Sequence, residues 1–155
     1  MVDTPSTPAL EALASSGIAH EVTRHGPVGS LEEAAAARGL EPDRLIKTMV
    51  VRRGEGDYLF VLVPGSRSIS WPKLRTLLGV NRLSMPDAAT AKEVTGYERG
   101  TITPFGATRA WPVIADERIT GRVSIGGGAH GVGVTLDGGA LIAHLQATIA
   151  DVTDV

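Results

Sequence analysis

The chain has 155 residues, of which 43% are hydrophobic and 21% charged, and it contains no cysteine. These values predict a single globular domain over residues 1–155, with a loose tail at residues 1–7. The missing cysteine excludes disulfides, thiolate metal sites and cysteine nucleophiles. Because no apolar run is long enough to span a membrane and no signal peptide opens the chain, we expect a cytoplasmic protein without membrane contact.

The net charge of −2 argues against a general nucleic-acid binder, but the basic residues are unevenly spread. Residues 44–82 carry eight Lys and Arg side chains and only two acids, a local charge of +6. A basic sector of this kind can contact a polyanion locally and release it. A solvated face whose charges are neutralised by the acidic flanks explains the pattern equally well.

The first third of the chain predicts two helices and a strand. Thr7, followed by a proline, is typical of a helix start, and Gly17 ends this first helix. Residues 18–24 alternate weakly between apolar and polar and predict a strand. A capping box that begins at Ser30 then predicts a second helix, which ends at Gly39.

A short apolar run, Leu45–Val51, predicts a buried strand, yet it carries Lys47 at its third position. Side chains alternate along a strand, so Lys47 is expected to share a face with Met49 and Val51. A lysine on an apolar face extends to solvent, pairs with an acid, or lies in a pocket with a shifted pKa. The pattern alone favours extension to solvent, whereas the rest of the chain favours a functional site.

A glycine-containing turn at residues 54–57 joins this strand to a second apolar run at 58–63, which predicts an antiparallel hairpin. Two strands this apolar are expected at the centre of a sheet or barrel. The later elements are helices and short strands, predicted at residues 71–78, 87–96, 112–115, 122–125, 131–136 and 138–146. This mixture predicts a mixed α/β (α+β) domain and argues against a doubly wound parallel sheet.

Two glycine-rich loops are candidates for chemistry. The first, residues 100–106, is stiffened by Pro104, and its glycines let another chain approach closely. The second, residues 126–131, matches GxGxxG, but we reject a dinucleotide site because a strand and not a helix follows it. What remains is a backbone-rich concavity beside His130, a side chain that donates and accepts hydrogen bonds near neutral pH. Spacing alone favours a surface turn and a structural histidine.

Other chemistries leave no trace in the sequence. It contains no Walker A loop, no HExxH motif and no GxSxG elbow. His20, His25 and His144 show no metal-ligand spacing with nearby acids. We therefore expect neither a metal nor a cofactor.

Together, these segments resemble the YbaK and prolyl-tRNA synthetase-associated editing domains, which are free-standing or inserted aminoacyl-tRNA deacylases. The resemblance covers nearly the whole chain. The strand with Lys47 is similar to the family's strand with its required lysine. Residues 95–97 and 100–106 are similar to the TGY segment and the GxxxP loop, the most specific signature. Residues 123–131 resemble the later glycine-rich turn, and residues 149–152 the closing segment.

This resemblance implies a fold and an activity. The fold would be a mostly antiparallel sheet closed into an irregular barrel and surrounded by helices. The activity would be hydrolysis of the ester that joins a wrong amino acid to the 3′ end of a tRNA. Its partners would be the acceptor end of a mischarged tRNA and, transiently, a synthetase. An activated ester needs no cofactor, because water can attack a carbonyl that is polarised and positioned.

The resemblance also implies a site. Lys47 would be catalytic, either anchoring the phosphate of the terminal adenosine or stabilising developing negative charge. The implied substrate-binding residues all lie in the two loops and are Gly100, Thr101, Ile102, Thr103, Pro104, Gly127, Gly128 and His130. No general base emerges, so proton transfer would rely on a tRNA hydroxyl or an ordered water. The histidine at position 130 resembles the alanine-clearing branch, so we expect alanine on tRNA(Pro), with Cys-tRNA(Pro) as the alternative.

Two other classes of function remain open. The chain could be a non-catalytic module that binds a tRNA end or a ligand like an aminoacyl-adenylate. It could also be an interaction domain whose hairpin edge pairs with a partner. Turnover of mischarged tRNA would distinguish an enzyme from the non-catalytic module. A functional role for Lys47 would argue against the interaction domain, which makes no use of this residue.

Overall fold

The computed structural model describes residues 6–155. Most of the tail expected at residues 1–7 lies outside the described part, but Thr7 is buried and hydrogen-bonded. The helices are α1 (Pro8–Ser16), α2 (Leu31–Ala37), α3 (Trp71–Leu78), α4 (Ala88–Thr95) and α5 (Gly138–Leu145), with one 3-10 turn, η1 (Pro42–Arg44). The strands are β1 (His20–Arg24), β2 (Ile46–Gly54), β3 (Asp57–Pro64), β4 (Ser68–Ile69), β5 (Val113–Asp116), β6 (Arg122–Gly126), β7 (Val132–Asp137), β8 (Thr148–Ala150) and β9 (Thr153–Asp154).

Each α-helix begins at a side-chain cap. The capping oxygen accepts a hydrogen bond from the backbone N–H three residues on, which satisfies one of the free donors of the first turn. These caps are Thr7, Ser30, Ser70, Asp87 and Asp137. The short strands β4, β8 and β9 were not predicted, because two or three residues carry no recognisable alternation.

The strands form three sheets, with orders β1-β7-β6, β2-β3-β5-β8 and β4-β9. Most pairs are antiparallel, but β3 pairs with β5, and β5 with β8, in parallel. The predicted mixed α+β class is therefore confirmed. The expected closed barrel is wrong, because in residues 6–155 only a single bridge, Leu45–Ser124, joins the first two sheets.

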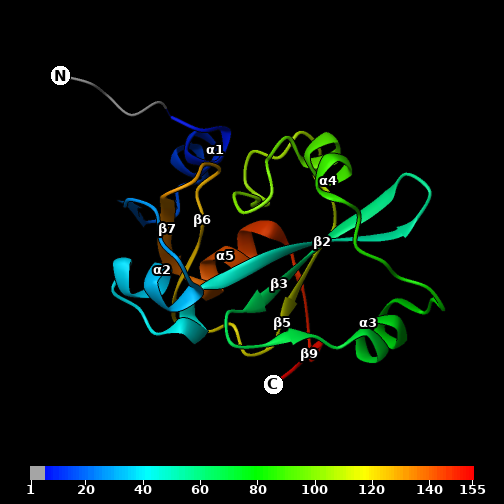
Figure 1. Ribbon diagram of the computed structural model, residues 1–155. Helices are drawn as coiled ribbons and strands as arrows, with labels where there is room; N and C mark the ends of the chain where they lie inside the picture. Colours follow the sequence, from blue (N-terminus) through cyan, green and yellow to red (C-terminus); the bar gives the residue numbers. More distant parts are fainter. Residues whose placement is uncertain (1–5) are drawn as a thin grey trace.

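The predicted hairpin forms from β2 and β3, but it does not lie at the centre of its sheet. Because β5 extends the sheet beyond β3, strand β2 is left at the edge. Within the described residues, its outer side is bridged only near its two ends, by Leu45–Ser124 and Arg52–Ser84. Figure 1 shows β2 as a long strand that runs from α2 and η1 towards the hairpin tip, with α4 to one side. An edge strand presents unpaired backbone groups, so the side of β2 between these bridges is available to a ligand.

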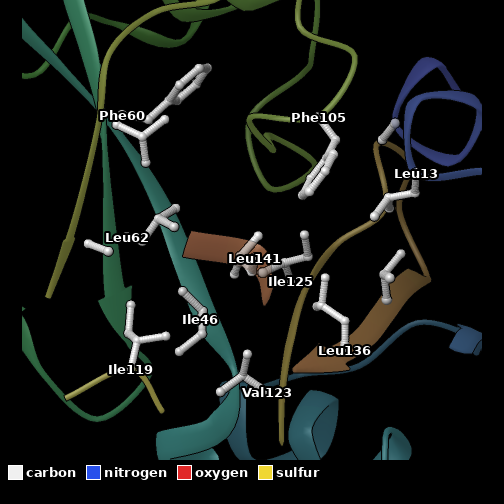
Figure 2. Close-up of a cluster of buried hydrophobic side chains, with 14 of the residues drawn as sticks. Leu13, Ile46, Phe60, Leu62, Phe105, Ile119, Val123, Ile125, Leu136 and Leu141 are labelled. Carbon is white, nitrogen blue, oxygen red and sulfur yellow. The ribbon is translucent and has the colours of Figure 1, made fainter. Parts of the chain in front are cut away.

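The strand β3 is buried from Tyr58 to Pro64 and separates two hydrophobic clusters. Phe60 and Leu62 point into the larger cluster with α1, α5 and the β6-β7 sheet, and Figure 2 shows Leu62 beside Leu141 of α5. The alternate residues of β3 point into the smaller cluster beneath α3. Strand β2 alternates in the same register, so Lys47 shares a face with Met49 and Val51 as predicted. None of the helices in residues 6–155 is long and apolar enough to cross a membrane.

Candidate functional site

A pocket of about 740 Å³ lies along the exposed edge of β2. Its walls come from β2, from the segment between β1 and the end of α2, from the start of α4, and from the two glycine-rich loops. Main lining residues are His25, Arg38, Leu45–Val50, Met85–Ala88, Arg99, Gly100, Ile102, Gly126 and Ala129–Val132. The fold thus brings segments from between residues 25 and 132 to one cavity.

Four of the predicted site residues line this pocket together: Lys47, Gly100, Ile102 and His130. Gly100 has a left-handed backbone, with φ +88°, and a Cβ there would lie 3.4 Å from Cε1 of His130. The two glycine-rich loops therefore touch at this point. A side chain at position 100 would be strained and would push against the imidazole.

His130 lies at the rim of the pocket and not in its depth. Its side chain is 71% exposed, and its Nε2 is 3.7 Å from a carboxylate oxygen of Glu98. Ile102, by contrast, is half-buried and packs against the main hydrophobic cluster. Of the two residues expected to limit the size of the acyl group, Ile102 is the one with a fixed position.

The other five predicted residues do not line the pocket: Thr101, Thr103, Pro104, Gly127 and Gly128. Thr101 is buried, and its hydroxyl donates to the carbonyl of Glu98 at 2.8 Å. A Cβ on Gly128 would lie 2.9 Å from Tyr97 and 3.1 Å from the Thr7 hydroxyl, so this position faces α1. Gly127 donates its N–H to Val132 at 2.8 Å and accepts from Thr7 at 2.6 Å. These contacts give the loops their shape.

The TGY segment has a structural role in the first loop. The hydroxyl of Tyr97 donates a 2.6 Å hydrogen bond to the carbonyl of Phe105, across residues 100–104. Burial raises the pKa of Tyr97 to about 12, so the phenol stays a neutral donor. Thr95 receives the Tyr97 N–H at 3.1 Å. The segment thus closes the loop that carries Gly100 and Ile102.

Lys47 is half-buried, and its ammonium group donates to the backbone carbonyl of Arg67 at 2.6 Å. No carboxylate in residues 6–155 forms an ion pair with it, and burial lowers its pKa. Arg67 is held in turn, because its Nε donates to the Thr153 hydroxyl at 2.7 Å and its Nη2 to the Thr153 carbonyl at 3.1 Å. The Thr153 hydroxyl donates to buried Asp116 at 2.9 Å. This chain of contacts fixes the lysine from the C-terminal end of the protein.

The basic sector at residues 44–82 contributes only Lys47 to the pocket. Others of its side chains are neutralised elsewhere: Arg53 pairs with Asp57 at 3.0 Å, and Lys73 pairs with Asp151 at 3.0 Å. The cations that do line the pocket with Lys47 are Arg38 and Arg99, which lie outside this sector.

Sequence analysis missed Arg38, His25 and Thr48, which also line the pocket. Each has a buried side-chain atom without a hydrogen-bond partner in the described residues: Nε of Arg38, Nε2 of His25 and Oγ1 of Thr48. The one sequence signal for any of these residues was the arginine directly after the alanine run of α2. At such a position a surface arginine and a site arginine look alike in sequence. Three further polar side chains thus belong to the pocket wall, although these buried atoms themselves are out of reach of a ligand in the open pocket.

Comparisons with known proteins agree with this picture. The model of the family described as "Aminoacyl-tRNA editing domain" matches residues 25–143. The proline–tRNA ligase of Syntrophotalea carbinolica is 32% identical over 136 residues, which cover 83% of this chain and 24% of the ligase. The crystal structure of a candidate trans-editing enzyme for prolyl-tRNA synthetase superimposes with a TM-score of 0.88 at 25% identity, covering 98% of this chain and 100% of that one.

One relative of similar size carries a different substrate in its name. It is a candidate Cys-tRNA(Pro)/Cys-tRNA(Cys) deacylase, EbsC, of Enterococcus faecalis, 24% identical over 126 residues, which cover 80% of this chain and 77% of that one. The chain spans only 17% to 24% of the length of the proline–tRNA ligases it matches. With the family match over most of its length and the matching fold, the chain belongs to the aminoacyl-tRNA editing domain family.

Proposed function

We propose that the chain hydrolyses the ester of a mischarged tRNA in trans, removing a small amino acid such as alanine from tRNA(Pro). The observation that carries this proposal is the ammonium group of Lys47. Lys47 is half-buried and lines the pocket, and its ammonium group is aligned by a carbonyl and not neutralised by a carboxylate in the described residues. The names of the relatives, which refer to proline–tRNA ligase and to trans-editing, support tRNA(Pro) as the carrier.

The reaction needs a polarised carbonyl and a placed water. Water attacks the ester carbonyl carbon, and the negative charge that develops on the carbonyl oxygen is stabilised by the ammonium of Lys47. The bond from this carbon to the ribose oxygen then breaks, and the ribose oxygen takes the proton that the water gives up. A tRNA hydroxyl or an ordered water relays this proton. Gly100 and Ile102 would hold the acyl group against β2.

Cysteine is the second candidate amino acid, because the relative EbsC is named for Cys-tRNA(Pro) and Cys-tRNA(Cys). His130, at the pocket rim, supports alanine through its resemblance to the alanine-clearing branch. A synthetase that binds transiently would supply the selection of the tRNA. Residues 1–155 would act as one editing domain.

The test is a panel of mischarged tRNAs with the protein at limiting concentration. Alanyl-, seryl-, cysteinyl- and prolyl-tRNA(Pro) and Cys-tRNA(Cys) would be incubated with the chain, and the remaining aminoacyl-tRNA measured over time. We expect many turnovers on Ala-tRNA(Pro) and little loss of Pro-tRNA(Pro). Fastest loss of the cysteinyl ester would favour the second candidate. Binding of the tRNAs without turnover would identify a non-catalytic module and overturn the proposal.

A further inference from the structure

Arg38 follows α2 directly, and its guanidinium reaches across the pocket wall to β6 and β7. Its Nη1 donates to the hydroxyl of Ser124 at 3.1 Å and to the carbonyl of Ile125 at 3.3 Å. The group lies flat against Gly133 of β7, where a Cβ would overlap the guanidinium. The absence of a side chain at position 133 therefore makes room for the arginine.

The charge of Arg38 has no counter-ion among the described residues. No carboxylate in residues 6–155 forms an ion pair with it. Its Nε is buried without a partner, and burial lowers its pKa. Keeping a partly desolvated cation without an anion costs free energy, and a ligand that brings the anion recovers this cost. The Nη2 atom of Arg38 makes no hydrogen bond with the described residues. Unlike Nε, it is not fully buried, so it is the donor available to a ligand.

The rest of the pocket also suits an anion. Its lining carries three Lys or Arg side chains and a single acid, Asp87. That carboxylate is already engaged, because it accepts the Thr90 N–H at 2.8 Å as the cap of α4. The backbone carbonyl of His25 lies against Gly131, the turn residue directly before β7, whereas the side chain of Arg38 lies against Gly133 within β7. His25, too, has a buried ring nitrogen without a partner.

We propose that Arg38 binds a phosphodiester group of the tRNA 3′ end, which leaves the ammonium of Lys47 free to act on the ester. This inference rests on the proposed function. The amino group of an aminoacyl ester is a cation and its ester is neutral, so the phosphodiesters are the only anions that the acceptor end brings into the pocket. A planar guanidinium with a free donor edge suits phosphate oxygens. Of the two roles considered for Lys47, the phosphate contact then belongs to Arg38.

Removal of Arg38 and removal of Lys47 should consequently change different kinetic constants. Removal of Arg38 should weaken binding, with KM for Ala-tRNA(Pro) rising about tenfold and kcat nearly unchanged. Removal of Lys47 should lower kcat. The slope of log affinity against log salt should become less negative by about 0.7 in Arg38→Met, because one phosphate contact is lost. Arg38→Lys keeps the charge and should keep most of this slope.

The decisive experiment does not depend on turnover. Binding of the trinucleotide CpCpA and of adenosine would be measured by NMR titration for wild type, Arg38→Met and Arg38→Lys. We expect Arg38→Met to bind CpCpA about tenfold more weakly and adenosine as well as wild type. Ser124→Ala is the matched control, because it removes a hydrogen bond that holds Arg38 but leaves the charge in place.

Several outcomes would overturn the inference. If Arg38→Met weakens the binding of CpCpA and of adenosine equally, or leaves the salt slope unchanged, Arg38 has only a structural role in linking α2 to β6. If Arg38→Met fails to fold, Arg38→Gln replaces it, because its amide keeps a polar group in the pocket wall without carrying a charge. CpCpA binding that depends on Arg38 in a protein that deacylates no tRNA would reject the proposed function and retain the phosphate site.

Discussion

The ammonium group of Lys47 donates a 2.6 Å hydrogen bond to the backbone carbonyl of Arg67. A carbonyl oxygen fixes the direction of the ammonium without neutralising it, whereas a carboxylate would do both. The charge of Lys47 therefore stays available to a ligand in the pocket. Arg67 is itself fixed by two hydrogen bonds to Thr153. The position of Lys47 is therefore set both by its place in β2 and by its fixed hydrogen-bond partner, Arg67.

Lys47→Met should abolish deacylation and leave the fold intact, because it removes the charge but keeps most of the apolar stem. The free energy of unfolding should change by no more than about 1.5 kcal/mol, since one hydrogen bond is lost and a desolvation cost is relieved. Deacylation of Ala-tRNA(Pro) and thermal unfolding would be measured side by side. Full hydrolysis by the variant, or inactivity that coincides with unfolding, would contradict the assignment.

The pH dependence of catalysis should report the lowered pKa of Lys47. In the proposed mechanism the ammonium form is the active one, so kcat should fall as pH rises through a pKa below the ordinary 10.5. Stability should change with the opposite sign. The unfolded chain keeps this proton up to 10.5 while the folded chain releases it earlier, so wild type should gain stability over Lys47→Met as pH rises between the two values.

Initial rates, corrected for spontaneous ester hydrolysis, and urea unfolding would both be followed from about pH 7 to about pH 10. The Lys47→Met protein is the control for every other titrating group. A kcat that stays flat over this range would show that the protonated lysine is not required.

Thr153→Val should lower kcat more than it lowers tRNA affinity, because it cuts the link from Asp116 through Thr153 to Arg67. We expect a loss in kcat on the order of tenfold and a loss of unfolding free energy of about 1 to 3 kcal/mol. Thr153→Ser keeps the hydroxyl and should recover most of kcat. Steady-state kinetics of the two variants would decide, and equal losses in both would reject a positioning role.

Ile102→Ala should let the pocket accept larger acyl groups. Because a small site rejects larger substrates by exclusion, the rate ratio of cysteinyl or prolyl to alanyl tRNA(Pro) should rise about tenfold. His130→Ala should shift the ranking in the same direction but less, since its side chain is 71% exposed at the rim. Rates of each variant on alanyl-, seryl-, cysteinyl- and prolyl-tRNA(Pro) would be compared with those of wild type.

Gly128→Ala is the control for this series, because position 128 faces Tyr97 and Thr7 and lies outside the pocket lining. It should cost stability and leave the substrate ranking unchanged. If His130→Ala slows every substrate by one factor, His130 is catalytic or structural and does not select by size.

Much of the secondary structure could be predicted from sequence because its determinants are local. The caps Thr7, Ser30 and Asp137 bond to N–H groups three residues away, so residue type and spacing reveal them. The hairpin of β2 and β3 is equally local. Lys47 was found because a charge inside an apolar strand violates the strand's own pattern.

The composition of the site was decided by contacts between distant parts of the chain. Lys47 reaches Arg67 across 20 residues, and both the Arg67–Thr153 and the Arg38–Ser124 contacts span 86. Whether β2 lies at the edge or the centre of its sheet depends on where β5 pairs, and neither strand encodes this alone. An arginine after a helix reads the same in sequence whether it meets solvent or a pocket, because its burial is set by the strands that fold against it.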